Sequence, residues 1–143
     1  MIGEFQGEYR WLSNFWITPI IIDGKQYRSV EHYFQACKAD NDATHEIIRS
    51  QRTPGDAKRF AKTITLRKGW NGMRIDVMRS GLQAKFDQHP DLQEKLMATY
   101  PRELVEGNKW HDTFWGVDLE TQEGQNHLGR LLMEIREEYM EII

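Results

Sequence analysis

Cysteine is almost absent from this sequence, since Cys37 is the only one among 143 residues. A single thiol excludes an internal disulfide and every zinc motif that is built on CxxC pairs. The five histidines are scattered and form neither an HxxxH nor an HExxH motif. We therefore expect no metal site.

A strong net charge is missing as well, because 19 Lys and Arg residues stand against 22 Asp and Glu residues, a formal charge of -3. No global field then draws the chain to nucleic acid or to a membrane surface. A nucleic-acid partner would need a local basic patch or recognition of one modified group. Such a local contact is the only nucleic-acid interaction that we expect.

Long hydrophobic runs are also lacking, and none approaches the roughly 18 to 20 residues that a membrane span requires. The first residues, MIGEFQGEYR, carry acids and no apolar core of a secretory signal. We therefore expect a cytoplasmic protein that does not bind membranes. The length suits one domain with one core, which we place at residues 1–143.

The pair Asp23-Gly24 separates the β-prone runs ITPIII and KQYRSV. Asp-Gly favours a two-residue hairpin turn, in which both residues adopt positive φ. Apolar residues then recur at helical spacing near 42–50, 54–64, 70–86, 89–99 and 126–140, with Asn126 a plausible N-cap of the last helix. The expected fold class is α+β, a mainly helical single domain with a small antiparallel β-sheet.

Residues 106–125, EGNKWHDTFWGVDLETQEGQ, show no periodicity. A long irregular segment inside a compact domain is often functional. Its FWG stretch places Trp115 beside Gly116, an arrangement that suits stacking of the indole on a flat ring. A lid that packs on the core explains the same residues equally well.

The stretch SVEHYFQACKAD predicts a short helix that Ser29 caps. Glu31, Gln35 and Lys38 lie at positions i, i+4 and i+7, so they share one face of this helix. Glu31 and Lys38 are then about 10 Å apart along the axis, which leaves room for a small ligand group between them. This face either lines a cleft or is solvated, as polar helix faces most often are.

Other polar residues have ordinary explanations beside functional ones. We expect His32 at the surface or at the edge of the core, and Lys85 at the surface near the end of its helix. Asn14 lies between aromatic residues, where it either satisfies a turn or binds a ligand.

Five segments, LSNF, SVEHYFQACK, VMRSGLQAKF, FWG and GQNHLGRLLMEIRE, follow one another as in the NADAR family, also called YbiA-like. The sequence resembles that family from about residue 8 to residue 137. The combination of EHYFQAxK with a distant NxLGxLLMExR is specific, whereas either motif alone is weaker. The family motif carries over to Asn14, Glu31, Gln35, Lys38, Trp115, Gly116, Asn126 and Gly129.

The resemblance implies an N-glycosidase, a hydrolase that cleaves a bond between a ribose carbon and nitrogen. Two kinds of substrate are associated with the family: ADP-ribose attached to guanine in nucleic acid, and phosphoribosylamino-pyrimidine intermediates of riboflavin synthesis. A short chain without a fused reductase or deaminase favours ADP-ribose. The sequence departs from the family at Ala39, where an aromatic residue is common, and at VDLETQEG, which puts the role of Asp118 in doubt.

The implied chemistry assigns roles to the motif residues. Glu31 is the expected acid/base, because a nearby carboxylate stabilises the positive charge that develops on the ribose or takes a proton from an attacking group. Lys38 is the expected nucleophile through a Schiff base, and no cofactor is consumed. The expected substrate-binding residues are Asn14, Gln35, Trp115, Gly116, Asn126, Lys85 and Asp118, with Lys85 also the alternative amine. We expect Trp115 to border the cleft, facing the helix of Glu31.

A non-catalytic ADP-ribose or nucleotide-binding module is the competing hypothesis. Such a module would keep Trp115 and Asn14 but would not need a carboxylate and an amine together. The presence of both Glu31 and Lys38 favours the enzyme.

Overall fold

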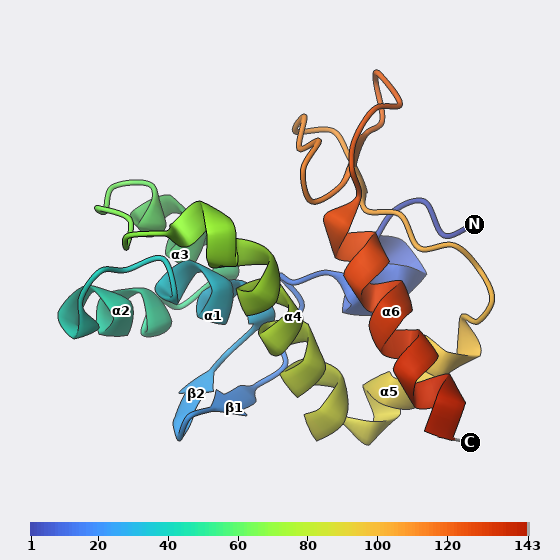
Figure 1. Ribbon diagram of the computed structural model, residues 1–143, viewed down its shortest axis with the longest axis horizontal. Coiled ribbons are helices and arrows are strands. Elements are labelled where there is room, and N and C mark those ends of the chain that lie inside the picture. The colour runs from blue at the N-terminus through green and yellow to red at the C-terminus, as the bar shows by residue number, and fades with distance from the viewer. Residues whose placement is uncertain (143) are drawn as a thin grey trace. The chain divides into compact units, whose positions relative to one another are not determined.

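The computed structural model describes residues 1–142, which form two compact units. The helical unit is residues 14–88, and the terminal unit joins residues 1–13 to the segment that begins at His89. The fold is mainly helical with a small antiparallel sheet, as the sequence predicts (Figure 1). None of the helices in the described part of the chain is long and apolar enough to cross a membrane.

The helical unit contains β1 (Ile20–Ile22), β2 (Lys25–Tyr27), α1 (Val30–Ala36), α2 (Asp42–Arg49), α3 (Pro54–Ala61) and α4 (Trp70–Gln88). The predicted hairpin is present, because Ile22 pairs with Lys25 across a two-residue turn. Asp23 and Gly24 in that turn both have positive φ, 52° and 77°. The turn chemistry in the sequence therefore fixes the register of this sheet.

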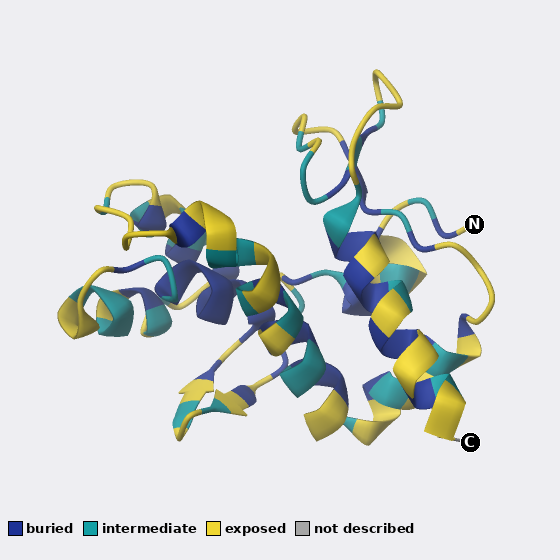
Figure 2. Ribbon diagram, viewed as in Figure 1, coloured by how far each residue is buried: buried dark blue, intermediate teal, exposed yellow. Residues whose placement is uncertain are grey.

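Helix α1 is buried along its whole length (Figure 2). Ser29 caps it as predicted, since its hydroxyl accepts the amide hydrogen of His32 at 3.1 Å. Helices α2, α3 and α4 all pack against α1. A helix surrounded in this way has no solvated face, so its polar side chains require partners inside the protein.

Contrary to the expectation of a surface or edge position, His32 is fully buried. Its Nδ1 lies 2.7 Å from the hydroxyl of Ser29, and its Nε2 lies 2.9 Å from the carbonyl oxygen of Gln51. Burial lowers the pKa of His32, which favours the neutral ring. His32 is therefore a structural residue that joins the start of α1 to the segment after α2.

Helix α4 presents small and apolar residues to α1. A Cβ atom at Gly81 would lie 3.0 Å from the Tyr33 ring and 3.1 Å from Val30, so glycine permits the two helices to approach closely. Met78, Leu82 and Phe86 are buried on the same helix.

Lys85 is also fully buried, so its predicted surface position is wrong. It follows Leu82 by three residues and precedes Phe86 by one, which places it on the buried stripe of α4. Burial lowers its pKa from 10.5 to about 7. The helical spacing of Lys85 already indicated a buried position, but the charge of lysine argued for the surface.

The terminal unit contains a 3-10 helix η1 (Gly7–Leu12), α5 (Pro90–Ala98), β3 (Gly107–Asn108), β4 (Val117–Asp118) and α6 (His127–Ile142). Residues 103–107 run beside the N-terminal segment. The amide of Ile2 donates to the carbonyl of Glu103, and the amide of Val105 donates back to Ile2. The segment 106–125 is thus less irregular than its sequence indicates, because β3 and β4 pair in parallel.

We predict opposite effects for alanine at two glycines that both lie in the first turn of a helix. A Cβ at Gly129 in α6 would lie 2.2 Å from the carbonyl oxygen of Leu104, whereas a Cβ at Gly72 in α4 meets nothing within 4 Å. Gly129→Ala should lower the free energy of unfolding by about 1 to 3 kcal/mol or more. Gly72→Ala should be neutral or raise it by up to about 1 kcal/mol. Equal denaturant midpoints for the two variants would contradict this assignment.

A second prediction concerns the pH dependence of stability. Because burial lowers the pKa of Lys85, the unfolded chain binds the proton more tightly, and the resulting cost to folding grows as pH falls from 10.5 to about 7. That difference corresponds to at most about 5 kcal/mol. Lys85→Met should therefore stabilise the fold at pH 6, by an amount that shrinks towards pH 10.

The exposed Lys109, replaced by methionine, supplies the control for general charge effects. Urea unfolding at pH 6, 8 and 10 measures both variants. A loss of stability in Lys85→Met that does not vary with pH would show that the ammonium is well compensated in the fold.

Candidate active site

Glu31 is the buried carboxylate of α1, with only 6% of its surface exposed. The side-chain amide of Gln35, one turn further along, donates to Glu31 Oε2 at 3.1 Å. This i, i+4 pair shows that the predicted polar face is not a solvated one. The amide hydrogen thus occupies one acceptor position of the carboxylate.

Asn14 joins this site through its backbone and its side chain. Its carbonyl oxygen accepts the amide hydrogen of Glu31 at 3.1 Å, and its Nδ2 lies 3.2 Å from the sulfur of Met78 in α4. The carbonyl oxygens of the Asn14 and Gln35 side chains are buried and lack a hydrogen-bond partner. Each such oxygen costs about 1 to 3 kcal/mol if it stays unsatisfied. A ligand that donates hydrogen bonds, such as a sugar, would satisfy them.

Lys38 follows the end of α1 and is half-buried. Its Nζ lies 5.3 Å from the centre of the Phe34 ring. Burial lowers the pKa of Lys38, the nearby Glu31 carboxylate raises it, and three neighbouring cations lower it further. The environment thus favours the neutral, nucleophilic amine more than water does.

The helical unit therefore brings together four predicted site residues: Asn14, Glu31, Gln35 and Lys38. Lys85 lies in the same unit, one turn beyond the Gly81 contact of α4 with α1. The remaining predicted residues, Trp115, Gly116, Asp118 and Asn126, belong to the terminal unit. That Trp115 faces the helix of Glu31 stays a prediction.

In the terminal unit, the motif residue Gly116 and the side chain of Asn108 contact a carboxylate that the sequence analysis missed, Glu106. A Cβ at Gly116 would lie 1.9 Å from Glu106 Oε2, so only glycine leaves room for the carboxylate. The Asn108 side chain donates to the same oxygen at 3.1 Å. Glu106 is 9% exposed. No sequence signal marked it, because an acidic residue at the edge of a long loop usually faces solvent.

Asn126 directly precedes α6, and its carbonyl oxygen accepts the amide hydrogen of Arg130 at 2.9 Å, as at an N-cap position. Its φ is 54°, and its side chain bridges two backbone groups of a distant segment. Oδ1 accepts from the amide of Glu106 at 2.9 Å, and Nδ2 donates to the carbonyl of Leu104 at 2.9 Å. Asn126 therefore holds the backbone that carries Glu106.

Trp115 lies in an aromatic cluster. The rings of Phe114 and Trp115 are 4.8 Å apart, and those of Phe114 and His127 are 4.5 Å apart. The Asp112 carboxylate fixes this turn, since Oδ1 accepts from the amides of Phe114 and Trp115 at 3.0 and 2.9 Å. Trp115 is only partly buried, so a flat ring can reach part of the indole.

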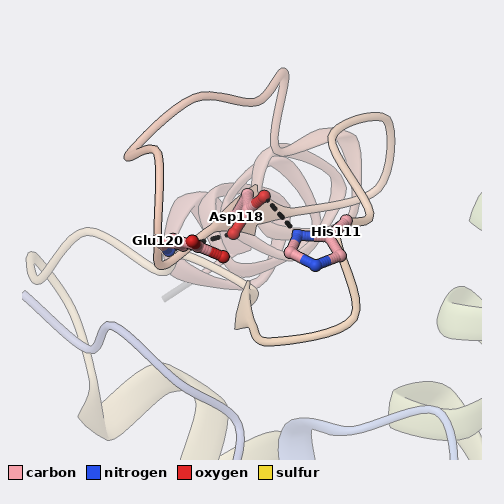
Figure 3. Close-up of side chains that lie close together, drawn as sticks. All are labelled: His111, Asp118 and Glu120. Carbon is pink, nitrogen blue, oxygen red and sulfur yellow. Dashed lines mark hydrogen bonds and ion pairs between the residues drawn. The ribbon is translucent and has the colours of Figure 1, made fainter.

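Asp118 lies with His111 and Glu120 in a small polar cluster (Figure 3). Its Oδ2 is 2.7 Å from His111 Nδ1, and its Oδ1 accepts from the amide of Glu120 at 2.9 Å. The hydrogen bond between the Asp118 and His111 side chains lowers the pKa of Asp118 and raises the pKa of His111. Both oxygens of Asp118 thus have partners within the loop, which Asp118 helps to order, and its role in substrate binding stays a prediction.

Comparisons with known proteins agree with this arrangement of motifs. Residues 3–140 match the NADAR domain. The N-glycosidase YbiA of Escherichia coli K12 is 43% identical over 133 residues, which cover 92% of this chain and 82% of that protein. A riboflavin biosynthesis protein of Vibrio vulnificus is 36% identical over 132 residues, which cover 91% of this chain and 35% of that protein.

A solved structure extends the likeness to the fold. The NMR structure of the Escherichia coli protein YbiA matches with a TM-score of 0.87 at 40% identity. The match covers 97% of this chain and 83% of the other. The domain match across nearly the whole sequence and the identity to these relatives lead to one conclusion: the chain belongs to the NADAR domain family.

Proposed function

We propose that this chain is an N-glycosidase that removes ADP-ribose from guanine in modified nucleic acid. The coarser part of this function, hydrolysis of an N-glycosyl bond, is the activity that names the curated relatives. The buried Glu31, with Gln35 bound to it and Lys38 beside it, is the observation that carries the proposal. A binding module has no need of a buried carboxylate and an amine whose pKa is lowered.

Glu31 is suited to stabilise the transition state of glycoside cleavage. As the bond between the ribose carbon and the nitrogen breaks, positive charge develops on the sugar ring. A carboxylate in a site of low polarity stabilises that charge more than one in water does. The leaving base takes up a proton that the attacking Lys38 amine releases, and Glu31 can carry protons between such groups.

Lys38 supplies a route through a covalent intermediate. Its neutral amine adds to the ribose carbon as the base leaves, and opening of the ring then yields an imine between that carbon and Nζ. Water adds to the imine, the carbon–nitrogen bond breaks, and the free sugar is released with the amine restored. Glu31 accepts a proton from the attacking water in this scheme.

Lys85 is the alternative amine, and one observation favours it. With a pKa of about 7, half of it is neutral at neutral pH, which is the form that attacks carbon. Lys38 has the better access, because it is half-buried whereas Lys85 is fully buried. We therefore assign the nucleophile to Lys38 and keep both residues in the trapping experiment below.

The second candidate substrate is a phosphoribosylamino-pyrimidine. It is favoured by the likeness to the Vibrio vulnificus riboflavin biosynthesis protein, of which this chain spans about a third. The same carboxylate and amine would cleave either substrate, because the bond broken is a ribose–nitrogen bond in both. Substrate choice therefore depends on groups that bind the base and the phosphate.

Incubation with ADP-ribosylated guanosine and, separately, with the phosphoribosylamino-pyrimidine tests this function. Chromatography measures the ADP-ribose or ribose phosphate that is released. Release from the guanosine adduct at the higher kcat/KM supports the proposal. Preference for the pyrimidine supports the second candidate, and tight binding of ADP-ribose without release from either substrate would identify a binding module.

We predict that Glu31→Gln lowers kcat by roughly two to four orders of magnitude with the fold intact, as loss of an acid/base group often does. Glutamine keeps the shape of the side chain, so Gln35 retains a partner. Glu94→Gln, at an exposed position of α5, is the matched control and should leave kcat unchanged. Turnover by folded Glu31→Gln at the rate of the control would remove Glu31 from the mechanism.

Borohydride added during turnover should trap a sugar adduct on the nucleophilic lysine, which peptide mass spectrometry locates. We expect the adduct on Lys38, and its loss in Lys38→Met. An adduct on Lys85 would assign the same chemistry to the other amine. Turnover without an adduct on either lysine would indicate direct attack by water with help from Glu31.

A further inference from the structure

Three cations of the helical unit gather around Lys38. Lys58 and Lys62 lie one turn apart at the end of α3, which packs against α1. Lys58 Nζ is 5.9 Å from the centre of the Phe15 ring. Phe15 follows Asn14, whose carbonyl oxygen binds the amide of Glu31. A single chain of contacts thus leads from Glu31 to Lys58.

Arg74 belongs to α4, which also packs against α1. It lies one turn before Met78 on α4, and the sulfur of Met78 contacts the side chain of Asn14. The segment of Asn14 and Phe15 therefore touches α1, α3 and α4 together. It places the Lys58 ammonium near the segment that binds Glu31, while the Arg74 guanidinium acts on Lys38 by charge repulsion.

The charges of this region are out of balance. Lys58, Lys62 and Arg74 all act on Lys38 by charge repulsion, whereas Glu31 is the carboxylate that attracts it. Neither Lys58 nor Lys62 forms an ion pair among residues 1–142, although Lys25, Arg49 and Arg59 of the same unit do. Lys58 and Lys62 repel each other and Lys38, and an anionic ligand would relieve that repulsion.

We propose that Lys58, Lys62 and Arg74 bind the phosphate ester on the ribose of the substrate, an inference that rests on the proposed N-glycosidase function. A phosphate on the ribose C5 oxygen lies only a few bonds from the carbon that Lys38 attacks. Arg74 can bind phosphate oxygens in a two-pronged manner, and the lysines add point charges. The two candidate substrates share this phosphate, so the site selects phosphorylated ribosides over plain nucleosides.

The test compares each N-riboside with the same compound lacking the phosphate, for the wild type, Lys58→Met, Lys62→Met and Arg74→Met. Each variant should lower kcat/KM on the phosphorylated substrate by roughly tenfold or more. The loss on the unphosphorylated substrate should be at least tenfold smaller. Lys25→Met, which removes a lysine already paired with Glu46, is the control and should change neither value.

Inorganic pyrophosphate provides a readout that does not depend on turnover. Calorimetry should detect its binding to the wild type and to Lys25→Met, and at least tenfold weaker binding to the double variant Lys58→Met/Lys62→Met. If no riboside is cleaved but pyrophosphate binds in this manner, the proposed function fails and the phosphate site stands.

Equal losses on both substrates, or pyrophosphate affinity that the double variant retains, would overturn the phosphate site and leave the glycosidase intact. A last arm replaces the riboside with unmodified single-stranded DNA. The proposal is wrong if the three variants weaken DNA binding but do not change kcat/KM on phosphorylated ribosides. In that case the cations contact a nucleic-acid backbone.

Discussion

The amide of Glu31 and the carbonyl of Asn14 form the hydrogen bond on which the candidate site depends. It ties the loop before the hairpin to the first turn of α1, where a backbone amide has no partner within the helix. Through the same loop, Met78 on α4 and Lys58 on α3 come to the same place. One backbone contact thereby fixes the relative positions of a carboxylate, a thioether and an ammonium.

Complete burial of α1 imposes a second constraint. A seven-residue helix is too short to be stable by itself, so packing by α2, α3 and α4 must hold it. That packing removes water from Glu31 and Gln35, and each must find a partner or remain unsatisfied. The unpaired oxygens of Asn14 and Gln35 are thus a cost that the fold bears at the candidate site.

Local rules predicted the local features well. Asp23-Gly24 predicted the hairpin register and Ser29 predicted the cap, because turn and cap chemistry act within a few residues. The shared face of Glu31 and Gln35 was also predictable, because helical spacing alone determines it. The burial of His32 was not predictable, since only the packing of other helices decides it. The burial of Lys85 follows its helical spacing, but a charged residue type argues for the surface.

Residues whose side chains support a distant segment of the chain could not be predicted from the sequence for a related reason. Asn126 resembles a helix cap in sequence, yet its side chain forms hydrogen bonds with the backbone of Leu104 and Glu106, which are 22 and 20 residues earlier in the sequence. Gly116 resembles a loop glycine, yet its missing Cβ is the space that the Glu106 carboxylate occupies. In both cases the motif position supports a second residue, so the motif marks Glu106 more surely than it marks a ligand contact of its own. Gly116, the Asn108 side chain and the backbone contact from Asn126 together order the buried Glu106 carboxylate, which is why a motif glycine and a motif asparagine are needed around it.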